Sequence, residues 1–120
     1  MISKGELKNM NEDIVYLFGF STRKQVYLDN LFDIVREQTD SGISIAIVLI
    51  HDGVIGTSKS GTIASTLGKL LSLSIAVFAL LPDLLARGIE PNTVDPRIKC
   101  IEYNDLVDLL AQTPKIASWM

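Results

Sequence analysis

The sequence predicts an α/β fold: a three-layer sandwich in which a mainly parallel sheet of four or five strands carries helices on both faces. Uncharged apolar runs alternate along the chain with segments of helical periodicity, which indicates repeated β-α units. Each run is continuously apolar, as in strands buried on both faces. Right-handed crossovers leave few topologies, and the flavodoxin-like order 2-1-3-4 is the simplest. The predicted strands are Ile14–Phe18, Ile43–Ile50, Leu73–Ala79 and Ile98–Tyr103.

The first helix is predicted directly after the first strand. Gly19 stops the strand, and Ser21 or Thr22 is expected to cap the helix with its hydroxyl group. From Lys24 to Thr39 apolar residues recur at helical spacing with charged residues between them, which indicates an amphipathic helix.

The later elements are shorter. Gly56–Gly61 is expected to form a polar loop before a second helix, and Pro82 fits the first turn of a third helix, Asp83–Arg87. The fourth strand is more polar than the others and is therefore expected near an edge of the sheet. Asn104 is expected to cap the last helix, after which the chain continues as a tail that ends near Trp119.

Length and composition limit the function classes. The 120 residues suit one domain, expected over residues 13–120 after a polar N-terminal extension, 1–12. An apolar fraction of 48% argues against disorder, and a net charge of −3 argues against direct nucleic-acid binding through a basic face. One cysteine forbids an intramolecular disulfide, and one histidine with one cysteine argues against a structural zinc site.

The chain is expected to be cytoplasmic and to have no direct contact with a membrane. Its longest apolar stretches reach about half the length that a bilayer-spanning helix needs. The N-terminal residues lack the apolar region of a signal peptide. Nothing in the sequence calls for a cofactor or a metal.

Candidate site residues follow the strands, because ligands of open α/β sheets gather at the carboxyl ends of strands. After the first strand, free amides, hydroxyls and cations either cap a helix beside solvated basic residues or hold an anion or a partner. The residues of this segment are Gly19, Phe20, Ser21, Thr22 and Arg23.

The second strand ends in His51, Asp52 and Gly53. Asp52 is expected to form an Asx-type turn with Gly53, which leaves His51 at an interface or in a proton-handling site. Asp83, after the third strand, belongs to the same expected surface. The segment Gly56–Thr62 has the glycine spacing of a P-loop, but Thr62 stands where that motif requires lysine, so a plain loop is expected.

Cys100 is the single thiol, and it lies inside the fourth predicted strand. A reactive cysteine needs exposure and an electropositive setting, which the interior of a strand does not supply. We therefore expect Cys100 to be buried and structural rather than a sulfur carrier.

Four segments together resemble the DsrH/TusB family of sulfur-relay proteins. No single motif among them is diagnostic, but they occur in the family's order over about residues 13–120. They are Leu49–Val54 with its Asp-Gly-Val turn, Ala79–Gly88, Ile98–Leu106 with its Glu-Tyr-Asn-Asp-Leu sequence, and Trp119.

The resemblance implies a DsrE/DsrF/DsrH-like fold and a role in cytoplasmic sulfur trafficking, either towards 2-thiolation of the tRNA wobble uridine or in sulfur oxidation. It implies a complex with DsrE/DsrF-like (TusC/TusD-like) subunits that carry persulfide on cysteine. The apolar fraction of 48% also favours association, as a homo-oligomer or a hetero-oligomer, because one small core does not hide that much apolar surface. DsrH-type subunits can carry a cysteine in the first helix, but Lys24–Thr39 has none. This pattern favours an accessory subunit without catalysis of its own, with Trp119 near a subunit contact and nucleic acid reached only indirectly.

Two alternatives come from the residues alone. One is a small binding module of flavodoxin-like fold that holds a phosphate or nucleotide through Ser21, Thr22 and Arg23. The other is an enzyme that uses His51 for proton transfer. The fold cannot separate these functions from a sulfur-relay role.

Overall fold

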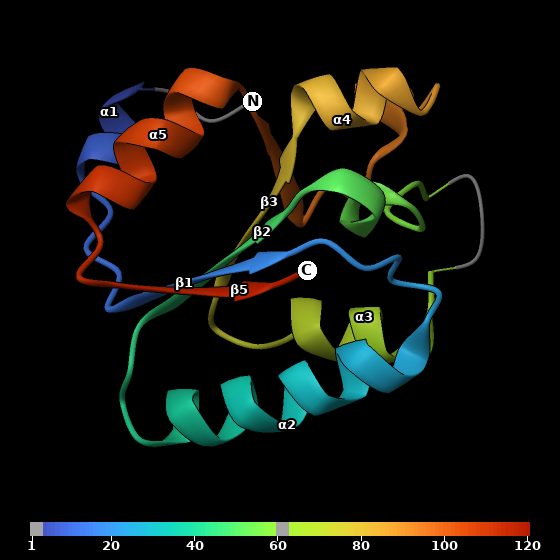
Figure 1. Ribbon diagram of the computed structural model, residues 1–120. Coiled ribbons are helices and arrows are strands. Elements are labelled where there is room, and N and C mark those ends of the chain that lie inside the picture. Colours follow the sequence, from blue (N-terminus) through green and yellow to red (C-terminus); the bar gives the residue numbers. More distant parts are fainter. Residues whose placement is uncertain (1–3, 60–62) are drawn as a thin grey trace.

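The computed structural model describes residues 4–59 and 63–120, and in this part of the chain five strands form one sheet (Figure 1). All neighbouring strands are parallel, as predicted, and their order is β4-β3-β2-β1-β5. The strands are β1 (Ile14–Phe18), β2 (Ile45–Leu49), β3 (Ala76–Leu80), β4 (Ile98–Ile101) and β5 (Lys115–Trp119).

The predicted order 2-1-3-4 is wrong in one adjacency. β3 pairs with β2 rather than with β1, so the first three crossovers all step in the same direction. The last crossover returns past β1, and β5 pairs with the free side of that strand from Ile14↔Lys115 to Phe18↔Trp119. The expected tail is therefore an edge strand, and β4 is the other edge, as its polarity predicted.

The helices are α1 (Lys4–Lys8), α2 (Gln25–Asp40), α3 (Ser65–Leu71), α4 (Leu81–Ala86) and α5 (Tyr103–Gln112), with two short 3-10 helices, η1 (His51–Val54) and η2 (Pro91–Thr93). In Figure 1, α2 and α3 cover one face of the sheet, and α1 and α5 cover the other. α4 follows β3 without a loop and lies at the carboxyl edge of the sheet. The three-layer arrangement is thus the predicted one.

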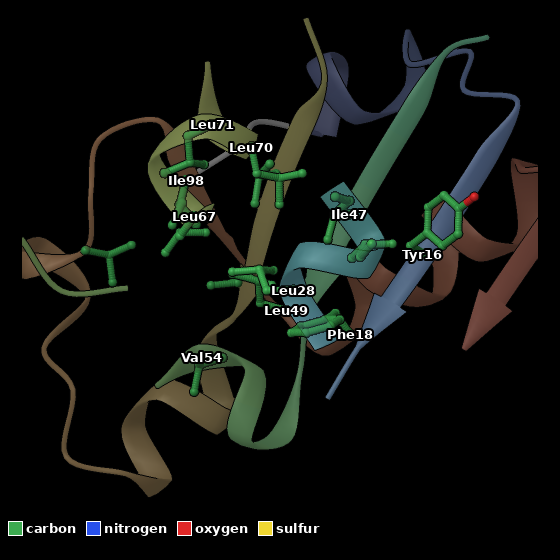
Figure 2. Close-up of a cluster of buried hydrophobic side chains, with 14 of the residues drawn as sticks. Tyr16, Phe18, Leu28, Ile47, Leu49, Val54, Leu67, Leu70, Leu71 and Ile98 are labelled. Atoms are coloured by element: carbon green, nitrogen blue, oxygen red, sulfur yellow. The ribbon is translucent and has the colours of Figure 1, made fainter. Parts of the chain in front are cut away.

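Alternate strand residues enter two separate cores, which explains why the strands are continuously apolar. Ile45, Ile47 and Leu49 face α2 and α3, and Figure 2 shows this larger core around Ile47 and Leu49. Ala46 and Val48, between them, face α1 and α5. Every residue of β2 is therefore buried.

Two local expectations differ from the structure. The segment expected as a polar extension contains α1, whose Leu7 is 2% exposed and belongs to the core on the α5 side. The cap of α5 is Glu102 rather than Asn104: its carboxylate accepts the Asp105 N–H, and its own N–H donates to the Asp105 carboxylate at 3.0 Å. This reciprocal pair is a capping box, a motif that satisfies two helix-end amides at once.

Within residues 4–59 and 63–120, no helix is long and apolar enough to span a bilayer.

Candidate functional site

The residues predicted as a site surface lie on loops at the carboxyl edge of the sheet. Because all strands are parallel, their carboxyl ends meet at this edge. The chain leaves β1 towards β2, whereas β5 lies on the opposite side of β1, so the topological switch point falls between β1 and β5. The Gly19 N–H donates to the Trp119 carbonyl at 2.9 Å, and the Met120 side chain lies against Gly19.

The loop after β1 is fixed by the turn that follows β2. Thr22 is fully buried, and its hydroxyl donates to the Ile55 carbonyl at 2.6 Å. Ser21 accepts the Arg23 N–H at 3.2 Å. α2 begins only at Gln25, and its N-cap residue forms no side-chain cap bond among the described residues. The prediction that Ser21 or Thr22 caps this helix is therefore wrong, because Thr22 serves a loop–loop contact instead.

Gly56 explains how the two loops approach so closely. Its φ of +92° is in the region that favours glycine, and a Cβ there would overlap the Thr22 hydroxyl and lie 3.3 Å from Arg23 Cγ. The aliphatic part of the Arg23 side chain thus lies over the Gly56 turn, and Arg23 as a whole is exposed at the surface. The P-loop-like segment is described from Gly56 to Lys59, and its residues 60–62 lie outside the described part of the chain.

Phe20 anchors the same loop. Its ring meets Phe18 edge-on at 5.9 Å between centroids and stacks on Tyr27 of α2 at 4.0 Å. Phe20 therefore connects the core to the first turn of α2, which leaves its ring little freedom to rearrange around a ligand.

His51 has an unusual backbone conformation at the end of β2. Its φ is +51°, and no other non-glycine residue in the described part of the chain has a positive φ. The His51 N–H donates to Asp83 Oδ2 at 2.7 Å, while the residue itself is exposed. Asp83 therefore holds the backbone of His51 rather than its imidazole.

Asp52 and Arg87 form a second link between η1 and α4. Arg87 Nη2 and Nε donate to Asp52 Oδ1 at 3.1 and 3.2 Å, and Arg87 Nη1 donates to the Asp83 carbonyl at 3.3 Å. An Asx-type turn was expected at Asp52. The structure instead shows the Asp52 carboxylate accepting hydrogen bonds from the Arg87 guanidinium. Arg87 was not singled out from the sequence, although its place four residues after Asp83 suits one helix face.

The link between His51 and Asp83 gives a testable expectation. Asp83→Ala should lower the free energy of unfolding by about 1–2 kcal/mol, because it leaves the His51 N–H without its acceptor and the positive φ without support. Chemical denaturation measures the change. Asp33→Ala, an exposed residue of α2, is the matched control and should change the free energy by less than about 0.5 kcal/mol. Equal losses in both variants would contradict this role of Asp83.

The thiol is where the sequence predicted it to be. Cys100 is 7% exposed, and its side chain joins Ile98 in the core that faces α2 and α3. Burial raises the pKa of the Cys100 thiol above its ordinary value. The described residues hold no cluster of three or more histidine, cysteine or acidic side chains arranged to bind a metal ion.

Trp119 lies in β5, paired with Phe18 of β1. It is partly buried and packs against the core of its own chain. A role of Trp119 at a subunit contact stays a prediction. The part of the Trp119 side chain that is exposed could take part in such a contact.

A family model described as DsrH like protein matches residues 21–116, which is most of the chain. The chain belongs to the DsrH/TusB family of sulfur-relay proteins. The resemblance inferred from the sequence is confirmed.

Curated relatives agree with this membership. The chain is 34% identical over 74 residues to Protein TusB of Pectobacterium carotovorum subsp. carotovorum (strain PC1), a match that covers 62% of this chain and 74% of that protein. It is 36% identical over 73 residues to Protein TusB of Buchnera aphidicola subsp. Baizongia pistaciae (strain Bp), which covers 61% and 73% respectively.

A solved structure supports the fold of this DsrH-family chain. The crystal structure of ychN protein from E. coli superposes with a TM-score of 0.73 over 90% of this chain and 99% of that one. At 14% sequence identity the likeness concerns the fold alone.

Proposed function

We propose that this DsrH-family chain is a non-catalytic, accessory subunit of a cytoplasmic sulfur-relay assembly. In this role it associates with DsrE/DsrF-like subunits, which carry the persulfide on their own cysteines. Family membership supports the relay, and the burial of Cys100 supports the accessory role. A carrier must present its sulfur to a donor and then to an acceptor, whereas this thiol lies in a core.

The relatives favour the tRNA branch of sulfur relay over sulfur oxidation. Both are named Protein TusB, and the resemblance associates that name with 2-thiolation of the wobble uridine. With a net charge of −3, the chain is proposed to meet tRNA only through its partners.

The two alternative functions have less support. The hydroxyl of Thr22, which a phosphate site in the first loop would use, donates to the Ile55 carbonyl. For an enzyme based on His51, the nearby carboxylate that could orient the imidazole is that of Asp83, and its Oδ2 accepts the His51 backbone N–H instead.

Sulfur loading tests the accessory role. The chain, alone and with its co-purified partners, is incubated with cysteine desulfurase and cysteine, and intact-protein mass is measured. We expect a gain of one sulfur atom on a partner cysteine and none on Cys100. Cys100→Ala should still co-purify with the partners and support sulfur transfer to the acceptor. A sulfur gain on Cys100, or loss of relay in a folded Cys100→Ala variant, would show a carrier instead.

A further inference from the structure

The helix α1 is held by one buried side chain and by polar contacts at its surface. Within residues 5–10, Leu7 is the buried residue, in the core on the α5 side. Gln112 Nε2, at the end of α5, donates to the Leu7 carbonyl at 2.9 Å and to the Met10 carbonyl at 3.4 Å. Lys99 Nζ of β4 donates to Glu6 Oε2 at 3.0 Å, and about half of each of these two side chains is exposed.

This helix would not form by itself. It has five residues, whereas isolated helices in water need about 12–15 residues to offset the cost of nucleation. Gly5 lowers its helix propensity further. α1 is therefore helical only while it is docked on the rest of the fold, so its docking and its folding are one event.

Two cavities border α1. Glu6 and Met10 line a cavity of about 280 Å³ against β3 and β4, and Phe78 of β3 also lines it. Leu7 and Lys8 line a second cavity, of about 350 Å³, against α5. The helix is thus the wall between the two cavities. Because atoms that face a cavity lack van der Waals partners, α1 gains less from its position than a closely packed helix would.

The connection from α1 to β1 ends in a clamp. The Asp13 N–H donates to the Ser44 carbonyl at 2.9 Å, and Asp13 Oδ2 accepts the Ser44 N–H at 2.9 Å. Asn11 and Glu12, just before this clamp, form no backbone-to-backbone hydrogen bond with other described residues. The chain can therefore swing about these two residues without disturbing the first strand.

We propose that α1 is a displaceable strap, which leaves and rejoins the sheet as one unit while the rest of the fold stays intact. Its departure removes the wall between the two cavities and opens one groove from α5 to β4. Phe78, which is 1% exposed while α1 is docked, lies at the apolar base of this groove beside the place that Leu7 leaves. The strap thus controls access to the face of the sheet that α5 covers (Figure 1). This inference does not depend on a role in sulfur relay.

Hydrogen exchange of the folded wild-type chain, followed by NMR at increasing urea concentrations, tests the strap directly. The Asn9 and Met10 N–H groups report on α1, because they donate to carbonyl groups of that helix. The Asp13 N–H reports on the clamp, and the Leu109 N–H reports on α5. We expect Asn9 and Met10 to exchange at least about a hundredfold faster than Asp13 and Leu109. Subdenaturing urea should leave the two faster rates unchanged, because release of the strap exposes little surface.

The strap also requires that α1 be docked most of the time. Asn9 and Met10 should therefore exchange at least about tenfold more slowly than in the urea-unfolded chain. Rates equal to that of Leu109 would show that α1 opens only with global unfolding, and rates equal to those of the unfolded chain would show that it is not docked. An Asp13 N–H that exchanges as fast as Met10 would place the opening inside the sheet. Each of these three outcomes would overturn the strap.

Two variants separate opening of the strap from unfolding of the chain. Gln112→Ala removes the side chain that binds two α1 carbonyls, and it should accelerate exchange at Asn9 and Met10 about fivefold. Asp83→Ala, which removes the acceptor of the His51 N–H, should accelerate exchange at Leu109 at least about fivefold and leave Asn9 and Met10 unchanged. Acceleration at all three residues by Asp83→Ala would contradict the independence of α1.

The dye 8-anilinonaphthalene-1-sulfonate, which binds exposed apolar surface, tests the groove. Leu7→Asp removes the apolar anchor of α1 and should raise the dye fluorescence several-fold over that of the wild type. Leu85→Asp, at an exposed leucine of α4, is the matched control and should leave the fluorescence unchanged. Circular dichroism and cooperative urea unfolding establish that each variant keeps its sheet. A folded Leu7→Asp variant without the rise would contradict the groove, and an unfolded one would contradict the independence of α1.

Discussion

Gly53→Ala should destabilise the fold by about 3 kcal/mol, near the upper end of the usual cost of forcing an extra methyl group into a packed site. A Cβ at Gly53 would overlap the carbonyl oxygen of Phe18 and lie 3.1 Å from its carbon. That carbonyl accepts the Ile50 N–H at 3.0 Å, so it cannot move without disturbing the pairing of β1 and β2. Urea denaturation monitored by circular dichroism measures the loss.

Gly68→Ala is the matched control for this substitution. Gly68 lies inside α3, and a Cβ there would have no described atom within 4 Å beyond its own helix backbone and chain neighbours. Alanine is the better helix former, so this change should stabilise the protein by about 0.5–1 kcal/mol. If both glycine variants changed stability in the same direction and by similar amounts, the close approach of η1 to β1 would not be what requires Gly53.

Cys100 should react with iodoacetamide at least about a thousandfold more slowly in the native protein than in urea, because labelling requires opening of a structure that is stable by several kcal/mol. Burial acts twice here. It blocks access to the sulfur, and it raises the thiol pKa, so less thiolate is present at neutral pH. Native labelling should also keep accelerating as pH rises past 9.0, the ordinary value for a thiol.

Labelling is followed by intact-protein mass, and the urea-unfolded chain serves as the fully reactive control. Cys100→Ala, which removes the sulfur from a packed core position, should lower the free energy of unfolding by about 1 kcal/mol and abolish labelling. Complete labelling of the folded protein within minutes at neutral pH would contradict the burial of this thiol and reopen a carrier role for the chain.

Three of the four predicted strands, β1, β2 and β3, are apolar on both faces, a pattern that few other structures produce. β4 was recognisable although Lys99 is exposed, because the residues on either side of Lys99 are apolar and buried. β5 was missed because it has neither pattern: it is an edge strand, and Lys115, Ile116 and Ser118 are exposed. The order of strands was wrong because handedness fixes how a crossover turns but not which way it steps along the sheet.

The candidate site was predicted in position but not in detail. Parallel topology alone gathers the loops after β1, β2 and β3 at one edge, so His51 and Asp83 were expected on one surface. Which donor meets which acceptor depends on long-range contacts, such as Thr22 with Ile55 and Asp52 with Arg87. These partners are 33 and 35 residues apart, and no local pattern encodes their pairing.

The pairing of β5 with β1 has a consequence for synthesis of the chain on the ribosome. Ile14 pairs with Lys115, so β1 receives its second neighbour only after about 100 further residues have been synthesised. Until then β1 has one free edge, with amide and carbonyl groups open to other nascent chains. A premature stop before Lys115 would leave that edge of β1 exposed permanently, in a chain whose other strands are all present.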